Sequence, residues 1–337
     1  MASQFIAIEP FTPAWKISNP HAQTVLANVV RPTAGVHFRR ERLNTPDGDF
    51  VDLDYAYVRR YHWLWTPLGN SAPIVFAVHG LEGSARRGYM CEIYRQLAYR
   101  GIRAVGLNFR SCSGEMNRTP RMYHSGATYD VELALNRLAE QFPDVPIGLV
   151  GFSLGANVTL KYMGEGGKGV KTAVSISPPF DLAAGSRVLA QGTSRIYTRH
   201  LLHSLKQKAK AKAAQLQPYI DVEAALNAQT FNEFDNAWAP LHGFKDAADY
   251  YRQCSSRNFL VDINKPTLIL RALDDPFFSP ADVPHDLIAE NRYIQAAFPQ
   301  HGGHVAFVEG TMPGKYRYWA ERQGAQFLAS IFAQQPG

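Results

Sequence analysis

The sequence predicts an α/β protein with a mostly parallel sheet, helices on both faces and a helical lid insertion. Two observations indicate this class. From residue 74 onward, short apolar runs alternate with longer helical patterns, which is the rhythm of repeated βα units. Residues 181–262 then show helical spacing without a convincing strand, before two further apolar runs and a helical C-terminal stretch.

Composition narrows the class of protein. The chain has 337 residues, of which 46% are hydrophobic and 19% charged, so it can bury a large core. Its net charge of +6 is well short of the concentrated basic patch of a nucleic-acid binder, and we expect no such partner. Three scattered cysteines, Cys91, Cys112 and Cys254, do not form a disulfide framework. Since the N-terminus also lacks a signal-peptide pattern, we expect a cytoplasmic protein.

The first predicted element is an antiparallel hairpin. Residues 51–57 alternate between apolar and other side chains at the period of a half-buried strand, with Asp52 and Asp54 in the non-apolar positions. The turn signal at residues 45–48 precedes this strand, which suggests pairing with residues 36–43.

The remaining elements follow from alternating apolar and helical patterns. Strands are expected at residues 74–80, 102–109, 146–152, 172–177, 266–272 and 293–298. Helices are expected near residues 88–100 and 127–141, from 154 and from about 314. The predicted organisation is a hairpin and first part of the core over residues 1–180, a helical lid over 181–262 and the remainder of the core over 263–337.

The strongest chemical signal is a GxSxG motif, Gly151 to Gly155, directly between an apolar strand and a helical run. This context is typical of a nucleophile elbow, in which a tight turn projects the hydroxyl of Ser153 above the sheet. The glycines leave room for the neighbouring backbone, and the N-terminus of the helix favours negative charge there. Ser153 is therefore the candidate nucleophile, and a glycine-rich turn capped by this serine is the alternative.

A nucleophilic serine requires an acid that orients its base, and the acid is expected after a later strand. Asp274 and Asp275 follow the strand at 266–272. We choose Asp275 because it immediately precedes Pro276, and we expect Asp274 to cap the loop.

The base is expected in a loop after the last strand, where His301 and His304 are found. His304 is preferred because residues 302–303, both glycine, supply a flexible approach to it, which leaves His301 as a loop histidine. The HxxH spacing is also compatible with a metal site, but that interpretation leaves the serine unexplained.

Residues 79–84 follow a strand and can form an oxyanion hole, with the N–H of Leu81 beside that of Leu154. We expect His79 to hold this loop. Because a carboxylate would oppose an anion site, we expect Glu82 to point away and make structural hydrogen bonds.

Two further segments leave alternatives open. In the polar block at residues 108–126, Arg110 and His124 either contact substrate or stabilise the loop, and Cys112 is not expected to act as the nucleophile.

Alternating lysines in the lid indicate a solvated helix face, with an anionic ligand or membrane surface as the alternative: Lys206, Lys208, Lys210 and Lys212. Apolar lid residues wall an acyl pocket or form plain core: Leu201, Leu205, Phe231, Phe234 and Trp238.

Ordered sequence blocks extend over most of the chain: SNPHAQT, TPDGDFVDLDY, HGLEGS, NFRSCSGE, RMYHSGATYD, GFSLGAN, HGFKDAADYYRQCS, DDPFFSP and HGGHVAF. With these blocks the chain resembles the YheT-type branch of the α/β-hydrolase superfamily, which is related to the abhydrolase-domain proteins of the EMB8 group. The resemblance implies an α/β-hydrolase fold with a helical lid, esterase-like activity and a triad at Ser153, Asp275 and His304. Departures at Ser111, Ala156 and Ala306 each add a side chain and are expected to narrow the pocket.

The resulting prediction is a serine hydrolase of small-molecule or lipid carboxylic esters that requires no metal or organic cofactor. Ser153 attacks the acyl carbonyl, His304 takes and returns the proton, and Asp275 orients the imidazole. Thioester hydrolysis or acyl transfer by the same triad, and a non-catalytic binding protein of the same fold, are the alternatives. The sequence carries no prediction of oligomeric state.

Overall fold

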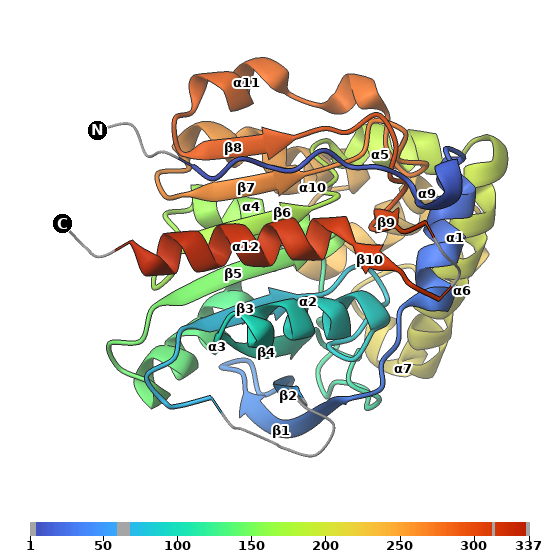
Figure 1. Ribbon diagram of the computed structural model, residues 1–337. Helices are drawn as coiled ribbons and strands as arrows, with labels where there is room; N and C mark the ends of the chain where they lie inside the picture. The colour runs from blue at the N-terminus through green and yellow to red at the C-terminus, as the bar shows by residue number, and fades with distance from the viewer. Residues whose placement is uncertain (1–4, 59–67, 312–313, 335–337) are drawn as a thin grey trace.

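A mixed sheet forms the centre of the computed structural model, which describes residues 5–58, 68–311 and 314–334. Within these residues the sheet has eight strands in the order β1-β2-β4-β3-β5-β6-β7-β8 (Figure 1). Strands β3 to β8 are parallel, and β1 and β2 are antiparallel at one edge, which confirms the predicted fold class. The strands are β1 (Val36–Asn44), β2 (Phe50–Val58), β3 (Ile74–Val78), β4 (Arg103–Asn108), β5 (Ile147–Phe152), β6 (Thr172–Ile176), β7 (Thr267–Leu270) and β8 (Ile294–Ala297).

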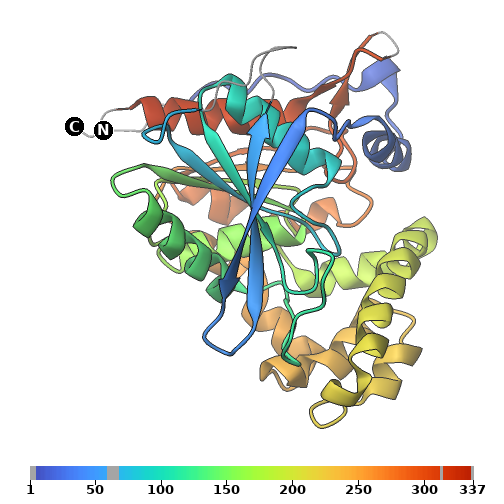
Figure 2. The same cartoon turned by 90° about the horizontal axis from the view of Figure 1, so that it is seen from below.

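Helices cover both faces of the sheet. Helices α2 and α12 lie on one face, and α3 and α4 lie on the other (Figures 1 and 2). Every residue of β3, β5 and β6 is buried, because both faces of these strands are covered. This explains why the strands appear in the sequence as continuous apolar runs. The helices of the core are α2 (Gly88–Tyr99), α3 (Thr128–Gln141), α4 (Leu154–Gly164), α11 (His285–Glu290) and α12 (Trp319–Ala333).

Between β6 and β7, all regular secondary structure of the described residues is helical. Its helices gather beyond the end of the sheet toward which the arrows of the parallel strands point (Figure 1). Ligands of open α/β sheets bind at this end. The helices of this insertion are α5 (Leu182–Leu189), α6 (Arg195–Ala211), α7 (Ala213–Leu216), α8 (Val222–Asn227), α9 (Phe231–Trp238) and α10 (Ala247–Cys254), with 3-10 turns η2 (Gly192–Ser194), η3 (Ala239–His242) and η4 (Ser256–Asp262).

The predicted hairpin is present, but the expectation that its second strand is half-buried is wrong. Asp52 and Asp54 on β2 are 1% and 0% exposed. Arginines cover them: Arg42 donates to Asp52, while Arg40 and Arg86 each donate twice to Asp54. Ion pairing therefore permits burial of acidic side chains that the alternating pattern placed among the polar positions.

Near its two ends, the chain forms elements that the sequence did not predict, and those of the N-terminal part contact β9 of the C-terminal part. Helix α1 (Pro20–Val30) follows the short turn η1 (Ala14–Lys16), and Asn19 caps it. The C-terminal helix begins at Trp319 rather than near 314, because the chain first forms a two-stranded sheet from β9 (Val308–Glu309) and β10 (Arg317–Tyr318). A further 3-10 turn outside the insertion is η5 (Pro280–Asp282). No helix among the described residues is both long enough and apolar enough to cross a membrane.

Candidate active site

Ser153 lies on the tight turn between β5 and α4. Its backbone has φ 54° and ψ −117°, a strained conformation for a residue with a side chain. A Cβ added at Gly155 would lie 2.4 Å from the carbonyl oxygen of Val78, and one added at Gly151 would lie 2.1 Å from that of Gly155. Glycine is therefore required on both sides of the serine for the turn to close.

Ser153, His304 and Asp275 are joined by two hydrogen bonds. The Oγ of Ser153 lies 2.9 Å from Nε2 of His304, and Nδ1 of His304 lies 2.8 Å from Oδ2 of Asp275. The side chain of Asp275 is 0% exposed. Asp274 lies outside this arrangement, because it accepts from the N–H of Gly303 and contacts His301 instead.

The position of His304 depends on residues that sequence reasoning missed. Its backbone N–H donates to Oγ1 of Thr24 on α1, at 3.0 Å. The ring of Phe277 stacks on its imidazole, with centroids 3.9 Å apart. A Cβ at Gly303 would lie 2.7 Å from Thr24 Oγ1, so glycine at this position permits the close packing of the loop on α1. Thr24 belongs to the SNPHAQT block, which signalled family resemblance without indicating a role.

His79 holds the loop after β3. Its Nδ1 lies 2.7 Å from the carbonyl oxygen of Gly80, and its Nε2 accepts from the N–H of Phe109 at 3.2 Å. This pattern requires a neutral ring with its proton on Nδ1. Burial lowers the pKa of His79 to about 4, which keeps the ring neutral. The histidine therefore fixes this loop, as expected.

The two candidate oxyanion donors lie beside Ser153. Leu81 follows β3, and Leu154 is the first residue of α4, where a backbone N–H has no carbonyl partner within its own helix. Both residues line the same cavity as Ser153.

Glu82, in the same loop, makes structural hydrogen bonds as expected. Its Oε1 accepts from the hydroxyl of Tyr123 at 2.7 Å and from Nζ of Lys208 at 2.8 Å. Its Oε2 accepts from the hydroxyl of Ser204. Since Lys208 and Ser204 lie on α6, this carboxylate joins the loop after β3 to the helical insertion.

The expectation of a solvated lysine face is wrong for two of the four lysines. Residues four apart share one face of a helix, so Lys208 and Lys212 point inward together. Nζ of Lys212 donates to Oδ1 of Asn117 at 2.8 Å and to the carbonyl of Thr119. Burial lowers the pKa of Lys212 to about 8. Of the other two, Lys210 is exposed.

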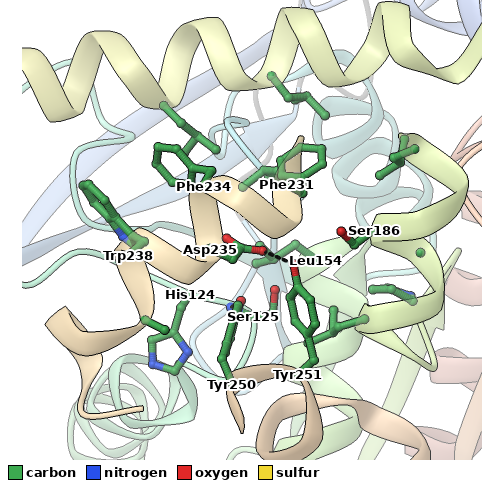
Figure 3. A pocket seen from close by; sticks show the side chains of 18 of the residues that line it. His124, Ser125, Leu154, Ser186, Phe231, Phe234, Asp235, Trp238, Tyr250 and Tyr251 are labelled. Carbon is green, nitrogen blue, oxygen red and sulfur yellow. Dashed lines mark hydrogen bonds between the residues drawn. The ribbon is translucent and has the colours of Figure 1, made fainter. Parts of the chain in front are cut away.

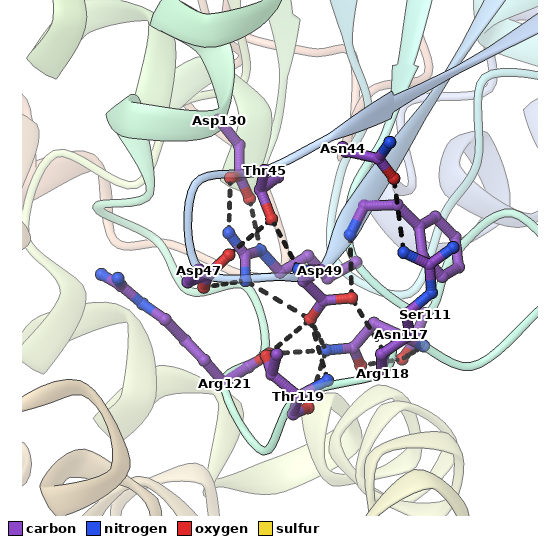
Figure 4. Close-up of polar contacts among 12 residues, drawn as sticks. Asn44, Thr45, Asp47, Asp49, Ser111, Asn117, Arg118, Thr119, Arg121 and Asp130 are labelled. Atoms are coloured by element: carbon purple, nitrogen blue, oxygen red, sulfur yellow. Dashed lines mark hydrogen bonds and ion pairs between the residues drawn. The ribbon is translucent and has the colours of Figure 1, made fainter.

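Arg110 stabilises the loop after β4 and does not line the cavity. Figure 4 shows the polar contacts of this region, which include those of Asp47, Asp49 and Asp130. The guanidinium of Arg110 pairs with Asp130 at 2.9 Å and with Asp47 at 2.6 Å, and it also approaches Asp49. Asp49 in turn accepts from Asn117, so the network joins the turn of the hairpin to the loop after β4.

The three family departures do not narrow the cavity, so that expectation is wrong. Ala156 and Ala306 are fully buried in the core, and the hydroxyl of Ser111 donates to Asn117 at 2.6 Å. None of the three lines the cavity. Cys112 is also buried, which raises the pKa of its thiol to about 11, so this thiol stays protonated near neutral pH.

A mostly apolar cavity lies between the sheet and the helical insertion (Figure 3). Ser153 is one of the residues that line it. His124 lines this cavity, in contrast to Arg110. The five apolar residues that were expected to form either a pocket wall or plain core also line it: Leu201, Leu205, Phe231, Phe234 and Trp238.

His301 and His304 face different partners, so the HxxH pair does not converge on one point. His301 contacts Asp274, and His304 contacts Asp275. In the part of the chain that the structure describes, no group of three or more His, Cys, Asp or Glu side chains is placed to hold a metal ion.

Comparison with known proteins shows the fold family of this chain. The pattern of the family described as alpha/beta hydrolase fold matches residues 73–311, which is more than half of the chain. The chain belongs to the α/β-hydrolase fold family. This hydrolase is 37% identical over 317 residues to the Escherichia coli (strain K12) protein named "Putative esterase YheT", covering 92% of this chain and 91% of the relative. The resemblance to the YheT-type branch is thereby confirmed.

More distant relatives of this hydrolase are eukaryotic. It is 25% identical to the Mus musculus protein "Phospholipase ABHD3", covering 97% of this chain and 80% of the relative. It is 30% identical to "Monoacylglycerol lipase" of Saccharomyces cerevisiae, covering 71% of this chain and 55% of the relative. Among solved structures, the esterase Pf2001 of Pyrococcus furiosus has a TM-score of 0.57 at 15% identity and covers 98% of this chain and 99% of its own, which shows a shared fold.

A half-buried carboxyl group, that of Asp235, also lines the cavity of this hydrolase. Oδ2 of Asp235 accepts from the hydroxyl of Tyr251 at 2.6 Å. Burial raises the pKa of Asp235 from its ordinary value to about 7, so the group binds its proton more tightly in the folded chain than in the unfolded chain. Its contribution to stability is therefore full below about pH 4 and is lost as the pH rises through about 7.

Replacement of Asp235 by Asn should change the pH dependence of stability, since the amide keeps an acceptor for Tyr251 and does not ionise. The measured quantity is the Tm of Asp235→Asn minus the Tm of the wild type. We expect this difference to be about 2–4 °C higher at pH 8 than at pH 5. Thermal unfolding at both pH values measures this. Glu223→Gln, which removes an exposed carboxyl of α8, is the control. A difference that stays constant with pH would contradict the assignment.

Loss of the buried guanidinium of Arg110 should destabilise the protein severely. In Arg110→Met the buried Asp130 loses its cation, and we expect a cost of about 3–5 kcal/mol in the free energy of unfolding. Arg118→Met, which alters an exposed arginine of the same loop, should cost less than about 1 kcal/mol. Denaturant titration of both variants gives the comparison, and equal costs would contradict the role of Arg110 in the network.

Proposed function

We propose that this α/β hydrolase cleaves carboxylic esters through a covalent acyl-enzyme formed on Ser153. The supporting observation is the hydrogen-bonded line from Asp275 through His304 to Ser153, which ends in a mostly apolar cavity. A serine hydroxyl becomes a good nucleophile only when a base accepts its proton, and His304 lies within hydrogen-bond reach for that transfer.

The roles follow from the order of contacts. The carboxylate of Asp275 accepts the Nδ1–H of His304, which leaves the lone pair of Nε2 directed at Ser153 Oγ. As Ser153 attacks the acyl carbon, Nε2 takes its proton, and the N–H groups of Leu81 and Leu154 stabilise the developing oxyanion. His304 then donates the proton to the leaving alcohol. A water molecule, activated by the same imidazole, releases the acid.

The substrate class follows from the cavity and from the names of the relatives. Those names include an esterase, a phospholipase and a monoacylglycerol lipase. A wall of leucine, phenylalanine and tryptophan side chains suits the acyl chain of a small-molecule or lipid ester. We assign the insertion over residues 181–262 as the lid of this pocket. The free, buried cysteines are compatible with action in the cytoplasm.

A fluorophosphonate probe tests the nucleophile directly, because it reacts with an activated serine. We expect wild-type protein to be labelled at Ser153 and to hydrolyse p-nitrophenyl esters, and Ser153→Ala to lose labelling together with at least about 10⁴-fold in kcat. Added alcohol acceptors separate hydrolysis from acyl transfer. Absence of labelling, with esters bound but not cleaved, would favour a binding protein of this fold.

Substitution at the two adjacent aspartates should have unequal effects. In Asp275→Asn the amide no longer holds His304 in the productive tautomer, and we expect kcat to fall by about 10⁴-fold. Asp274→Asn keeps an acceptor for Gly303 and should lower kcat by less than about tenfold. Steady-state kinetics of the two variants, after circular dichroism has shown that both are folded, decide the assignment. Equal losses would show that the acid was assigned wrongly.

A further inference from the structure

The apolar cavity contains a small group of polar side chains from three helices of the insertion. Asp235 comes from α9, Tyr251 from α10 and Ser186 from α5, and all three line the cavity (Figure 3). The proposed ester cleavage does not use any of them. Their positions place hydrogen-bonding atoms in a wall made mainly of leucine and aromatic side chains, which also includes His124, Ser125 and His242.

Two of these groups retain hydrogen-bonding capacity. Oδ2 of Asp235 accepts from Tyr251, while no hydrogen bond from a described residue reaches its other carboxyl oxygen. Ser186 is 7% exposed, and its hydroxyl interacts with that of Tyr251 without forming a short hydrogen bond. A buried hydroxyl such as that of Ser186 is rarely left without a close partner, because it loses water without gaining a full hydrogen bond. A polar group on a bound ligand would supply the missing partner.

A ligand hydroxyl fits this pair better than an ammonium group. Burial raises the pKa of Asp235 to about 7, so both protonation states are populated near neutral pH. A hydroxyl donates to the ionised carboxylate and accepts from the protonated carboxyl, and it also pairs with Ser186 in either direction. An ammonium group only donates, and it is therefore matched to the ionised form alone.

We propose that Asp235 and Ser186, with Tyr251 orienting the carboxyl, form a polar subsite that binds a hydroxyl group of the ester substrate away from the scissile bond. This inference rests on the proposed function, because the subsite lines the same cavity as Ser153. The hydroxyl belongs either to the acyl chain or to the alcohol part of the ester, for example a glycerol. The subsite thus selects among esters that the apolar wall alone would not distinguish.

Matched substrate pairs test the subsite and separate the two sources of the hydroxyl. The first arm compares p-nitrophenyl decanoate with p-nitrophenyl hydroxydecanoates that carry the hydroxyl at successive positions. The second arm compares methyl decanoate with 1-monodecanoylglycerol. For each pair, the measured quantity is the ratio of kcat/KM for the hydroxylated ester to that for the plain ester. Asp235→Leu, Ser186→Ala and the exposed control Glu223→Gln are measured beside the wild type.

In at least one arm we expect the wild type to prefer the hydroxylated ester. This preference should fall by about tenfold or more in Asp235→Leu and by about threefold or more in Ser186→Ala, mainly through KM, and should persist in Glu223→Gln. Ser186→Ala leaves the carboxyl of Asp235 unchanged, so it decides the matter if Asp235→Leu does not fold.

Ratios that are the same in the wild type and in the folded variants would overturn the subsite. A stronger preference for an ester with an amine in place of the hydroxyl would also overturn it. In both cases the plain esters are still cleaved, so the proposed function stands. Failure of the wild type to cleave any ester, together with absence of fluorophosphonate labelling at Ser153, would instead overturn the proposed function and the subsite with it.

Discussion

The arrangement depends on the contact between His304 and Ser153, because it joins segments that are 151 residues apart in the chain. Each partner is held by its own constraint. The serine is fixed by a turn that only glycine neighbours permit, and the histidine is fixed by Thr24 on α1 and by the ring of Phe277. Two rigid loops at one end of a parallel sheet therefore meet without requiring either to move.

The helical insertion is coupled to this centre by buried charge. Glu82 lies in the loop that carries the Leu81 N–H, and it accepts hydrogen bonds from Ser204 and Lys208 on α6. Lys212, one turn further on, is inserted among carbonyl and amide oxygens of the loop after β4. Displacing α6 would separate these buried partners, and the energetic cost of unpaired buried charge keeps the insertion in place.

The cavity between the insertion and the sheet combines two kinds of surface. Aromatic and aliphatic side chains of α6 and α9 supply an apolar wall, while Asp235 and Ser186 place polar atoms within it. Such atoms lower stability when they lack partners, so their presence in the wall is better explained by ligand recognition than by packing. The same cavity thus contains the proposed nucleophile and the proposed polar subsite.

Periodicity and motif context were enough to predict the parallel core, the hairpin and the turn at Ser153, because these depend on neighbouring residues in the chain. The order of Ser153, Asp275 and His304 along the sequence also followed from local motifs at strand ends. The burial of Asp52, Asp54, Lys208 and Lys212 did not follow, since charged side chains become buried only when distant partners meet them. Thr24 and Phe277 likewise acquire their roles only when α1 and the loop after β7 pack against His304. Asp235 and Ser186 come together only when the helices of the insertion converge on one cavity. Local sequence determines backbone preference, whereas the partners of a buried polar group are decided by long-range packing.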